Sequence, residues 1–268
     1  MFDGNPLVAA PPEEVPLSKA PLVRVIAQVR FPTILSIGER SFVAAFQEKI
    51  RVEYPVLQPE QTHGFVITPQ GLESTSPSMV WRFIDKTEQW RVSLTSEFLS
   101  LETTNYSSRT DFLKRFNELL MAADSHIKPQ ILDRLGLRYI ARLTDEALEQ
   151  ITAFVRPEIS GLLGSQVASY AEQAINDSLF TLPDSREQLY ARWGRLPVNV
   201  TIDPTAIEPI AKPSWILDLD MFTMPFLEKK AFEVDPIIDD ASRFAERLYT
   251  FFRWVVTRDF LRHFGGKV

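Results

Sequence analysis

The chain of 268 residues contains no cysteine. This absence excludes a disulfide framework, a zinc site built on thiolates and a cysteine nucleophile. A chain without thiols is also typical of a reducing compartment. With 45% hydrophobic and 24% charged residues, the composition is that of a globular protein that can bury a core. We therefore expect a cytoplasmic protein that needs neither disulfides nor metals to fold.

Long apolar runs are absent as well. A membrane-spanning helix needs roughly 18 consecutive apolar residues, and the richest segment, Leu248 to Phe264, is interrupted by arginine, aspartate and histidine. The first basic residue, Lys19, follows three acidic residues. Such a start does not match a secretory signal, which opens with basic residues and an unbroken apolar run. We expect neither a signal peptide nor contact with a membrane.

The familiar catalytic motifs are missing too. The sequence has no HExxH, no GxSxG, no GxxxxGK[ST] and no GxGxxG, and only ten glycines are available to bring backbone close to a phosphate. The histidines lie in unrelated segments, at His63, His126 and His263. The sequence therefore identifies no catalytic residue, and we expect no cofactor and no metal. Whether the protein is an enzyme stays open.

A surplus of positive charge is also lacking, because the formal net charge is −6. Proteins dedicated to nucleic acids gain most of their affinity by neutralising phosphates with basic residues. The net charge argues against a nucleic-acid partner, although it leaves room for a local basic patch.

Periodicity predicts alternating strands and three amphipathic helices. Strands are expected at 22–31, over a meander at 79–103, and at 134–143, 188–196 and 215–223, with helices at 39–53, 109–127 and 236–264. Ser108 and Asp111 form a capping box at the start of the second helix. The alternation of the meander changes phase near Thr95–Glu97, which indicates a tight turn or a bulge there.

These elements predict an α+β fold with mainly antiparallel sheet covered by long amphipathic helices. Because strands followed by a helix occur twice, we expect two similar halves. The expected organisation is an extended lead-in at 1–20, a first α+β half at 21–143, a helical connection at 144–188 and a second half at 189–268. In the connection, helices are expected near Asp145–Phe154 and Gln166–Asp177.

Several segments together resemble a known family. They are PLVRVIAQVRF at 21–31, WRVSLTSEFLSLETTNYSSRTDFLKRF at 90–116, RLGLRYIARL at 134–143, WILDLD at 215–220 and the terminal helix that leads to Phe264-Gly265. The chain is similar, over roughly Pro21 to Gly265, to a sporadically distributed family of bacterial proteins without an established activity. The resemblance implies a stand-alone cytosolic protein of about this length, and it carries over no site residue.

Three arginines are the main candidate ligand-binding residues. Arg134, Arg138 and Arg142 fall on one face of the 134–143 strand, where side chains at alternate positions lie about 6–7 Å apart. Three guanidinium groups on that face suit a phosphate or a carboxylate held by forked hydrogen bonds. The alternative, which we favour because charged residues are mostly exposed, is a solvated face or cross-strand pairs with carboxylates.

Two other clusters have simpler explanations. Asp218 and Asp220 share a strand face, but their spacing matches no calcium loop, so we do not assign a metal site. Trp81, Trp90 and Trp215 lie on apolar strand faces. They indicate a packed core in preference to a cavity for an aromatic or apolar ligand.

The leading functional hypothesis is a non-enzymatic binding or interaction protein. A protein partner or self-association would use apolar positions of the final helix, such as Phe260, Leu261 and Phe264. The alternative is an enzyme or sensor for a small anionic ligand held by the three arginines. A weaker third hypothesis is nucleic-acid binding through the same arginines.

Overall fold

The computed structural model describes residues 2–62, 65–68, 71–74, 78–183, 187–224 and 229–268. It divides into two compact units. Unit 1 comprises Met1–Val25, Leu137–Met224 and Ser242–Val268, and unit 2 comprises Ile26–Gly136 and Pro225–Ala241. Each unit is assembled from segments far apart in the sequence, so the units have other bounds than the sequential halves expected above.

Three elements run through both units: β1 (Leu22–Arg30), β9 (Arg134–Leu143) and α6 (Val234–Val255). The other elements of unit 1 are α3 (Asp145–Glu149), α4 (Ile151–Phe154), α5 (Pro157–Ser160), 3-10 helices at Gly161–Gly164 and Ala168–Tyr170, β10 (Ala174–Thr181), β11 (Glu187–Leu196), β12 (Ser214–Thr223) and α7 (Arg258–His263). Those of unit 2 are a 3-10 helix at Leu35–Gly38, α1 (Arg40–Ile50), β2 (Val56–Thr62), β3 (Phe65–Thr68), β4 (Gly71–Ser74), β5 (Ser78–Ile84), β6 (Trp90–Leu94), β7 (Phe98–Thr103), α2 (Arg109–His126), β8 (Ile131–Leu132) and β13 (Lys230–Ala231).

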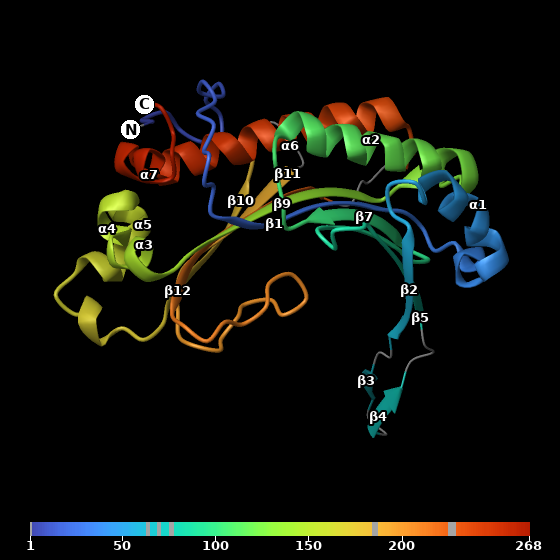
Figure 1. Ribbon diagram of the computed structural model, residues 1–268, viewed down its shortest axis with the longest axis horizontal. Coiled ribbons are helices and arrows are strands. Elements are labelled where there is room, and N and C mark those ends of the chain that lie inside the picture. Colours follow the sequence, from blue (N-terminus) through green and yellow to red (C-terminus); the bar gives the residue numbers. More distant parts are fainter. Residues whose placement is uncertain (1, 63–64, 69–70, 75–77, 184–186, 225–228) are drawn as a thin grey trace. The chain divides into compact units, whose positions relative to one another are not determined.

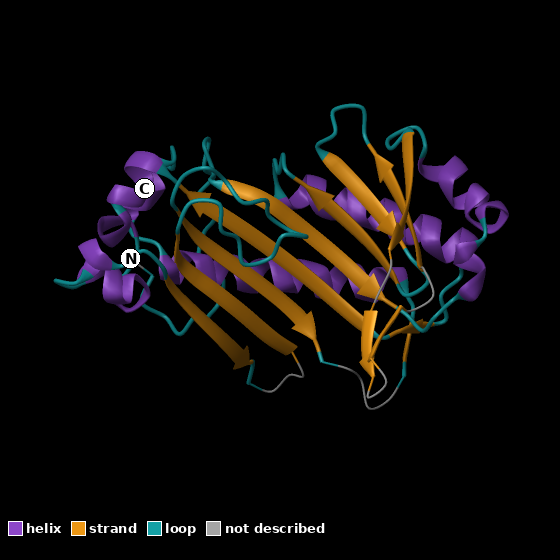
Figure 2. Ribbon diagram, turned by 90° about the horizontal axis from the view of Figure 1, so that it is seen from below, coloured by secondary structure: helices purple, strands orange, loops and turns teal. Residues whose placement is uncertain are grey.

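Nine strands are hydrogen-bonded in the order β10-β11-β12-β9-β1-β7-β6-β5-β2. The pairings β10–β11, β11–β12, β7–β6, β6–β5 and β5–β2 are all antiparallel. Figure 1 shows α2 next to the strands of unit 2 and most of α6 next to those of unit 1, and Figure 2 shows the strands in a view turned by 90°. The α+β class with a mainly antiparallel sheet under long helices is thereby confirmed.

In unit 2, α2 closes the apolar face of the meander. The Ser108 side chain accepts a hydrogen bond from the Asp111 backbone N–H at 3.1 Å, so the predicted cap at the helix start is confirmed. The ring of Phe112 on α2 stacks on Trp90 of β6, with their centroids 5.9 Å apart. Residues 95–97 form the turn between β6 and β7, as the change of phase indicated.

In unit 1, α6 covers the sheet in the same manner. Phe251 of α6 contacts Phe180 of β10, with ring centroids 5.7 Å apart, and Trp215 of β12 is fully buried. Together with buried Trp81 and Trp90 in unit 2, this confirms that the tryptophans fill the core. Fully burying such side chains contributes about 1.5–3 kcal/mol each, so the covered sheet face is the main source of stability.

The final helix is not continuous, so the prediction of one helix over 236–264 was wrong. It breaks after Val255, where Val256 forms an isolated β-bridge with Val155. The Thr257 side chain then accepts from the Phe260 N–H at 3.3 Å and starts α7. Helical periodicity is the same on both sides of the break, which is why the sequence does not reveal it.

Two of the three residues expected at the partner surface, Phe260, Leu261 and Phe264, are buried, and Phe264 is half-buried. Phe260 is only 1% exposed and Leu261 only 2%. Phe260 packs edge-on against Phe154 of α4 and Phe252 of α6, with centroids 6.0 and 5.6 Å away. The turn into α7 therefore directs Phe260 and Leu261 into the core, and these two side chains present no surface for association.

The N-terminal segment lies along α6. Arg247 donates to the carbonyl oxygens of Pro6 and Ala9 at 2.9 and 2.8 Å. The Val15 N–H donates to the Tyr249 hydroxyl at 2.7 Å. Side chains of α6 thus satisfy backbone groups of a segment that has no sheet or helix of its own.

The connection between the halves is only partly helical. The helix expected near Gln166–Asp177 is wrong, because β10 begins at Ala174 and pairs along its length with β11. At Gly194 of β11, which has a φ of 144°, an added Cβ would lie 1.9 Å from the Ala174 carbonyl oxygen. Only glycine permits this close approach of the two strands.

Among the described residues, no helix is long and apolar enough to cross a membrane.

Candidate functional site

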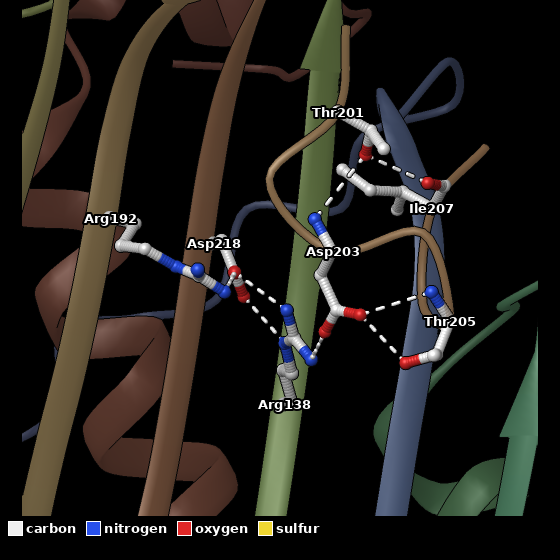
Figure 3. Close-up of polar contacts among 7 residues, drawn as sticks. All are labelled: Arg138, Arg192, Thr201, Asp203, Thr205, Ile207 and Asp218. Carbon is white, nitrogen blue, oxygen red and sulfur yellow. Dashed lines mark hydrogen bonds and ion pairs between the residues drawn. The ribbon is translucent and has the colours of Figure 1, made fainter. Parts of the chain in front are cut away.

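The candidate site is a cluster of charged side chains on the sheet face of unit 1 that α6 does not cover. Its core is Arg138 of β9, Arg192 of β11 and Asp218 of β12 (Figure 3). Asp203 and Thr205 come from the loop at 197–213 that joins β11 to β12. Strand alternation puts the strand residues on this face, because their neighbours in sequence point into the core.

Arg138 uses a different guanidinium nitrogen for each carboxylate contact. Its Nε and Nη2 bind the two oxygens of Asp218 at 2.7 and 2.8 Å, and its Nη1 binds Asp203 at 2.7 Å. Asp218 also accepts from Arg192 at 2.8 Å, and these two residues face each other in the β11–β12 register. Such forked contacts are the strong form of a charge-assisted hydrogen bond.

The cluster holds the 197–213 loop against the sheet. Asp203 accepts from the Thr205 hydroxyl at 2.6 Å and from the Thr205 N–H at 3.1 Å. Loop residue Ile207 is almost fully buried, and its carbonyl oxygen accepts from Thr201 at 2.8 Å. Asp203 therefore connects an internally bonded loop to the strand residue Arg138 (Figure 3).

Burial makes these contacts strong. The Asp218 residue is 2% exposed. Burial by itself would lower the pKa of Arg138, but its hydrogen bonds to Asp218 and Asp203 and their charges raise it. For Asp203 burial acts to raise the pKa, yet the hydrogen bonds from Thr205 and Arg138 lower it to about 2. Arg138 and Asp203 are thus charged at neutral pH and compensate each other.

The three arginines of the sequence prediction have separate surroundings. Arg138 is engaged by carboxylates, as in the cross-strand pairs that we favoured. Arg142 donates from Nη2 to the Glu208 carbonyl oxygen at 2.8 Å, and burial lowers its pKa. The guanidinium of Arg134 lies next to Gly136, where an added Cβ would come within 3.3 Å of it. Within unit 1, Arg138 and Arg142 thus have different partners.

Around Arg138 the cluster is a closed charge network, whereas the buried Nε of Arg192 has no hydrogen-bond partner among the described residues. An anion that entered it would have to displace Asp218 or Asp203 from Arg138. In the described part of the chain, no group of three histidine or acidic residues is placed to hold a metal ion. The arrangement fixes strands and a loop, and it offers no nucleophile paired with a base.

Sequence reasoning missed Arg192 and Asp203. The signal for Arg192 was its position on a strand next to the one that carries Asp218, but the register of the two strands was unknown. For Asp203 the sequence holds no signal, because a loop residue has no periodicity. Asp218 was noted as an acidic position, and its partners Arg138 and Arg192 are now defined.

Comparison with known proteins adds no relative. No family model matches the chain, and no curated protein matches it. The resemblance to the bacterial family described above therefore stays a prediction.

Arg138→Met tests the network. The variant keeps most of the packing volume but leaves the buried Asp218 with a single cationic partner, so we expect a loss of about 3 kcal/mol in the free energy of unfolding. Urea denaturation monitored by tryptophan fluorescence measures it. The control is Arg262→Met, which removes an exposed pair with Asp259 and should cost less than about 1 kcal/mol. Equal losses in the two variants would contradict a structural role for Arg138.

The lowered pKa of Asp203 predicts a pH dependence. Because the pKa falls from its ordinary 3.8 to about 2 on folding, the stabilisation is complete above pH 3.8 and is lost as the pH falls toward 2. Asp203→Asn has no carboxyl to titrate, so its stability should fall less over this interval. Urea denaturation at a series of pH values gives the comparison. If the two proteins lose stability in parallel, Asp203 is not the group responsible.

Proposed function

We propose that this protein is a non-enzymatic binding or interaction protein of the cytoplasm. The observation that carries the proposal is a set of large apolar side chains exposed within a short stretch of unit 1. They are Leu162, Val167, Tyr170 and Leu179, and Tyr170 is 85% exposed. Single exposed apolar residues are common, and what favours an interaction surface here is that four of them follow one another within 18 residues of the sequence. We call residues 162–179 the exposed apolar segment.

The exposed apolar segment replaces the final helix as the partner surface. Phe260 and Leu261, which the sequence suggested, are buried. Tyrosine is favoured in recognition surfaces because its ring supplies a large contact area while its hydroxyl stays hydrated. The closed network around Arg138 supports the same view, since the most conspicuous charged cluster serves the fold. The absence of cysteine supports the cytoplasm as the compartment.

Site-specific photo-crosslinking tests the proposal. A benzoylphenylalanine placed at Tyr170 should form covalent adducts in cells that express the protein, because a partner covers this position. The matched control places the same residue at Leu35, an 83% exposed position of unit 2. We expect several-fold more adduct at position 170, read as bands of higher mass on a denaturing gel. Equal or absent adducts at both positions would refute the proposed role of this segment.

A second candidate function is favoured by Arg142. Burial lowers the pKa of its guanidinium, and the contact of this side chain with the Glu208 carbonyl oxygen does not neutralise its charge. A small anion bound here would compensate that charge. This is the sensor or enzyme for an anionic ligand that the arginine-rich strand suggested, confined to one of its three arginines.

Phosphate binding tests this second candidate. Inorganic phosphate should raise the melting temperature of the wild-type protein by specific binding, and Arg142→Gln should abolish that increase. Phosphate also stabilises proteins generally by exclusion from their surface, so Arg262→Gln serves as the control for the nonspecific increase. The same increase in all three proteins would refute an anion site at Arg142.

A further inference from the structure

The two outer strands of the sheet differ in how their free edges are protected. An exposed edge presents unpaired N–H and C=O groups to other chains, and natural proteins block such edges with proline, lysine, bulges or covering segments. In unit 2, edge strand β2 contains Pro59 and Glu60, which pairs with Arg82. In unit 1, edge strand β10 reads AINDSLFT. It has neither proline nor lysine, and its one charged residue is Asp177.

The pairing of β10 with β11 defines which of its backbone groups face outward. The Leu182 N–H donates to the Glu187 carbonyl oxygen at 3.0 Å, and this pair continues the β10–β11 register. In an antiparallel ladder, hydrogen-bonded pairs alternate with non-hydrogen-bonded pairs. The even-numbered residues of β10 are therefore bonded to β11. The N–H and C=O groups of Ile175, Asp177, Leu179 and Thr181 point away from it.

We infer that β10 is a dimerisation edge, and that its occupant is β10 of a second copy of this chain, added as an antiparallel strand. The inference rests on the proposed interaction function, because it names a partner for the exposed apolar segment. β10 ends that segment, and its Leu179 is 56% exposed. A twofold interface needs a strand that is complementary to itself.

Charge and hydrogen bonding select one register for this pairing. The outward-facing residues must pair with one another, and placing Asp177 opposite its own copy would oppose like charges, which is destabilising. Shifting the pairing so that Ser178 lies on the twofold axis places Asp177 opposite Leu179 of the second copy. Ile175 then lies opposite Thr181, so the outward groups pair along the strand. The Asp177 carboxylate already accepts a hydrogen bond from Tyr190, which raises the pKa of that tyrosine.

Edge blocking gives the first test. The Leu179 N–H faces outward, so Leu179→Pro removes a donor from the interface without removing one from the β10–β11 hairpin. Sedimentation equilibrium should give twice the 30.7 kDa chain mass for wild type and the chain mass for Leu179→Pro. Leu179→Thr, which keeps the N–H and the preference for strand, should remain dimeric. A monomeric wild type at every concentration, or a dimeric Leu179→Pro, would overturn the inference.

A crosslink tests the register and does not depend on the folding of the proline variant. In this cysteine-free chain, Ser178→Cys introduces one thiol. At the twofold axis, the two Cα atoms of a non-hydrogen-bonded pair would lie about 4.5 Å apart, within the range for a disulfide. Ser178→Cys should therefore form a disulfide-linked dimer under mild oxidation. Asn176→Cys should not, because its two copies would lie roughly 14 Å apart along the strands. No crosslink from Ser178→Cys, or equal crosslinking of both variants, would overturn the register.

The outcomes separate this inference from the proposed function. An adduct between position 170 and a different protein, with a monomeric wild type, would keep the interaction function and refute the β10 dimer. A β10 dimer without any excess of adduct at position 170 would keep the dimer and refute partner binding by the exposed apolar segment.

Discussion

The buried carboxylate of Asp218 is the constraint on which the arrangement of unit 1 depends. A carboxylate that is 2% exposed is costly unless cations and hydrogen bonds compensate it, and here Arg138 and Arg192 supply both. Because each arginine belongs to another strand, the same contacts fix β9, β11 and β12 side by side. Arg138 reaches further to Asp203 and so fixes the loop that joins two of those strands. One charged cluster thereby organises the face of the unit 1 strands that lies opposite α6.

The opposite face depends on apolar packing and on a break in the last helix. Had α6 continued through residue 257, the side chains that follow would have stayed in helical phase with it. Instead, Thr257 starts a new helix, and Phe260 closes against Phe154 and Phe252. The arginine and tyrosine side chains of α6 are then used to hold the N-terminal segment. Phe260 and Leu261, two of the residues that the sequence suggested for partner contact, are thereby buried within the chain.

What the fold leaves exposed is a stretch that no helix or loop of the described residues uses. Tyr170 and Leu179 lie at the surface, and β10 ends the sheet with backbone groups directed outward. An edge without proline or lysine is an aggregation hazard unless a specific partner covers it. A protein that exposes an apolar stretch and a strand edge, and whose Arg138 is fully engaged by carboxylates, is suited to association. Burial of apolar surface and backbone hydrogen bonding, which build the core, are also the interactions that such an association would use.

Local pattern in the sequence determined the α+β class, the antiparallel meander, the Ser108 cap and the buried tryptophans, because each of these depends on residues close together in the chain. It also placed Arg138 and Asp218 on the faces of their strands. Tertiary structure alone decided that these two side chains meet, that Asp203 joins them and that Phe260 turns inward. The physical reason is that strand register, loop path and helix breaks are set by contacts between distant segments, and those contacts leave no periodic trace in the sequence.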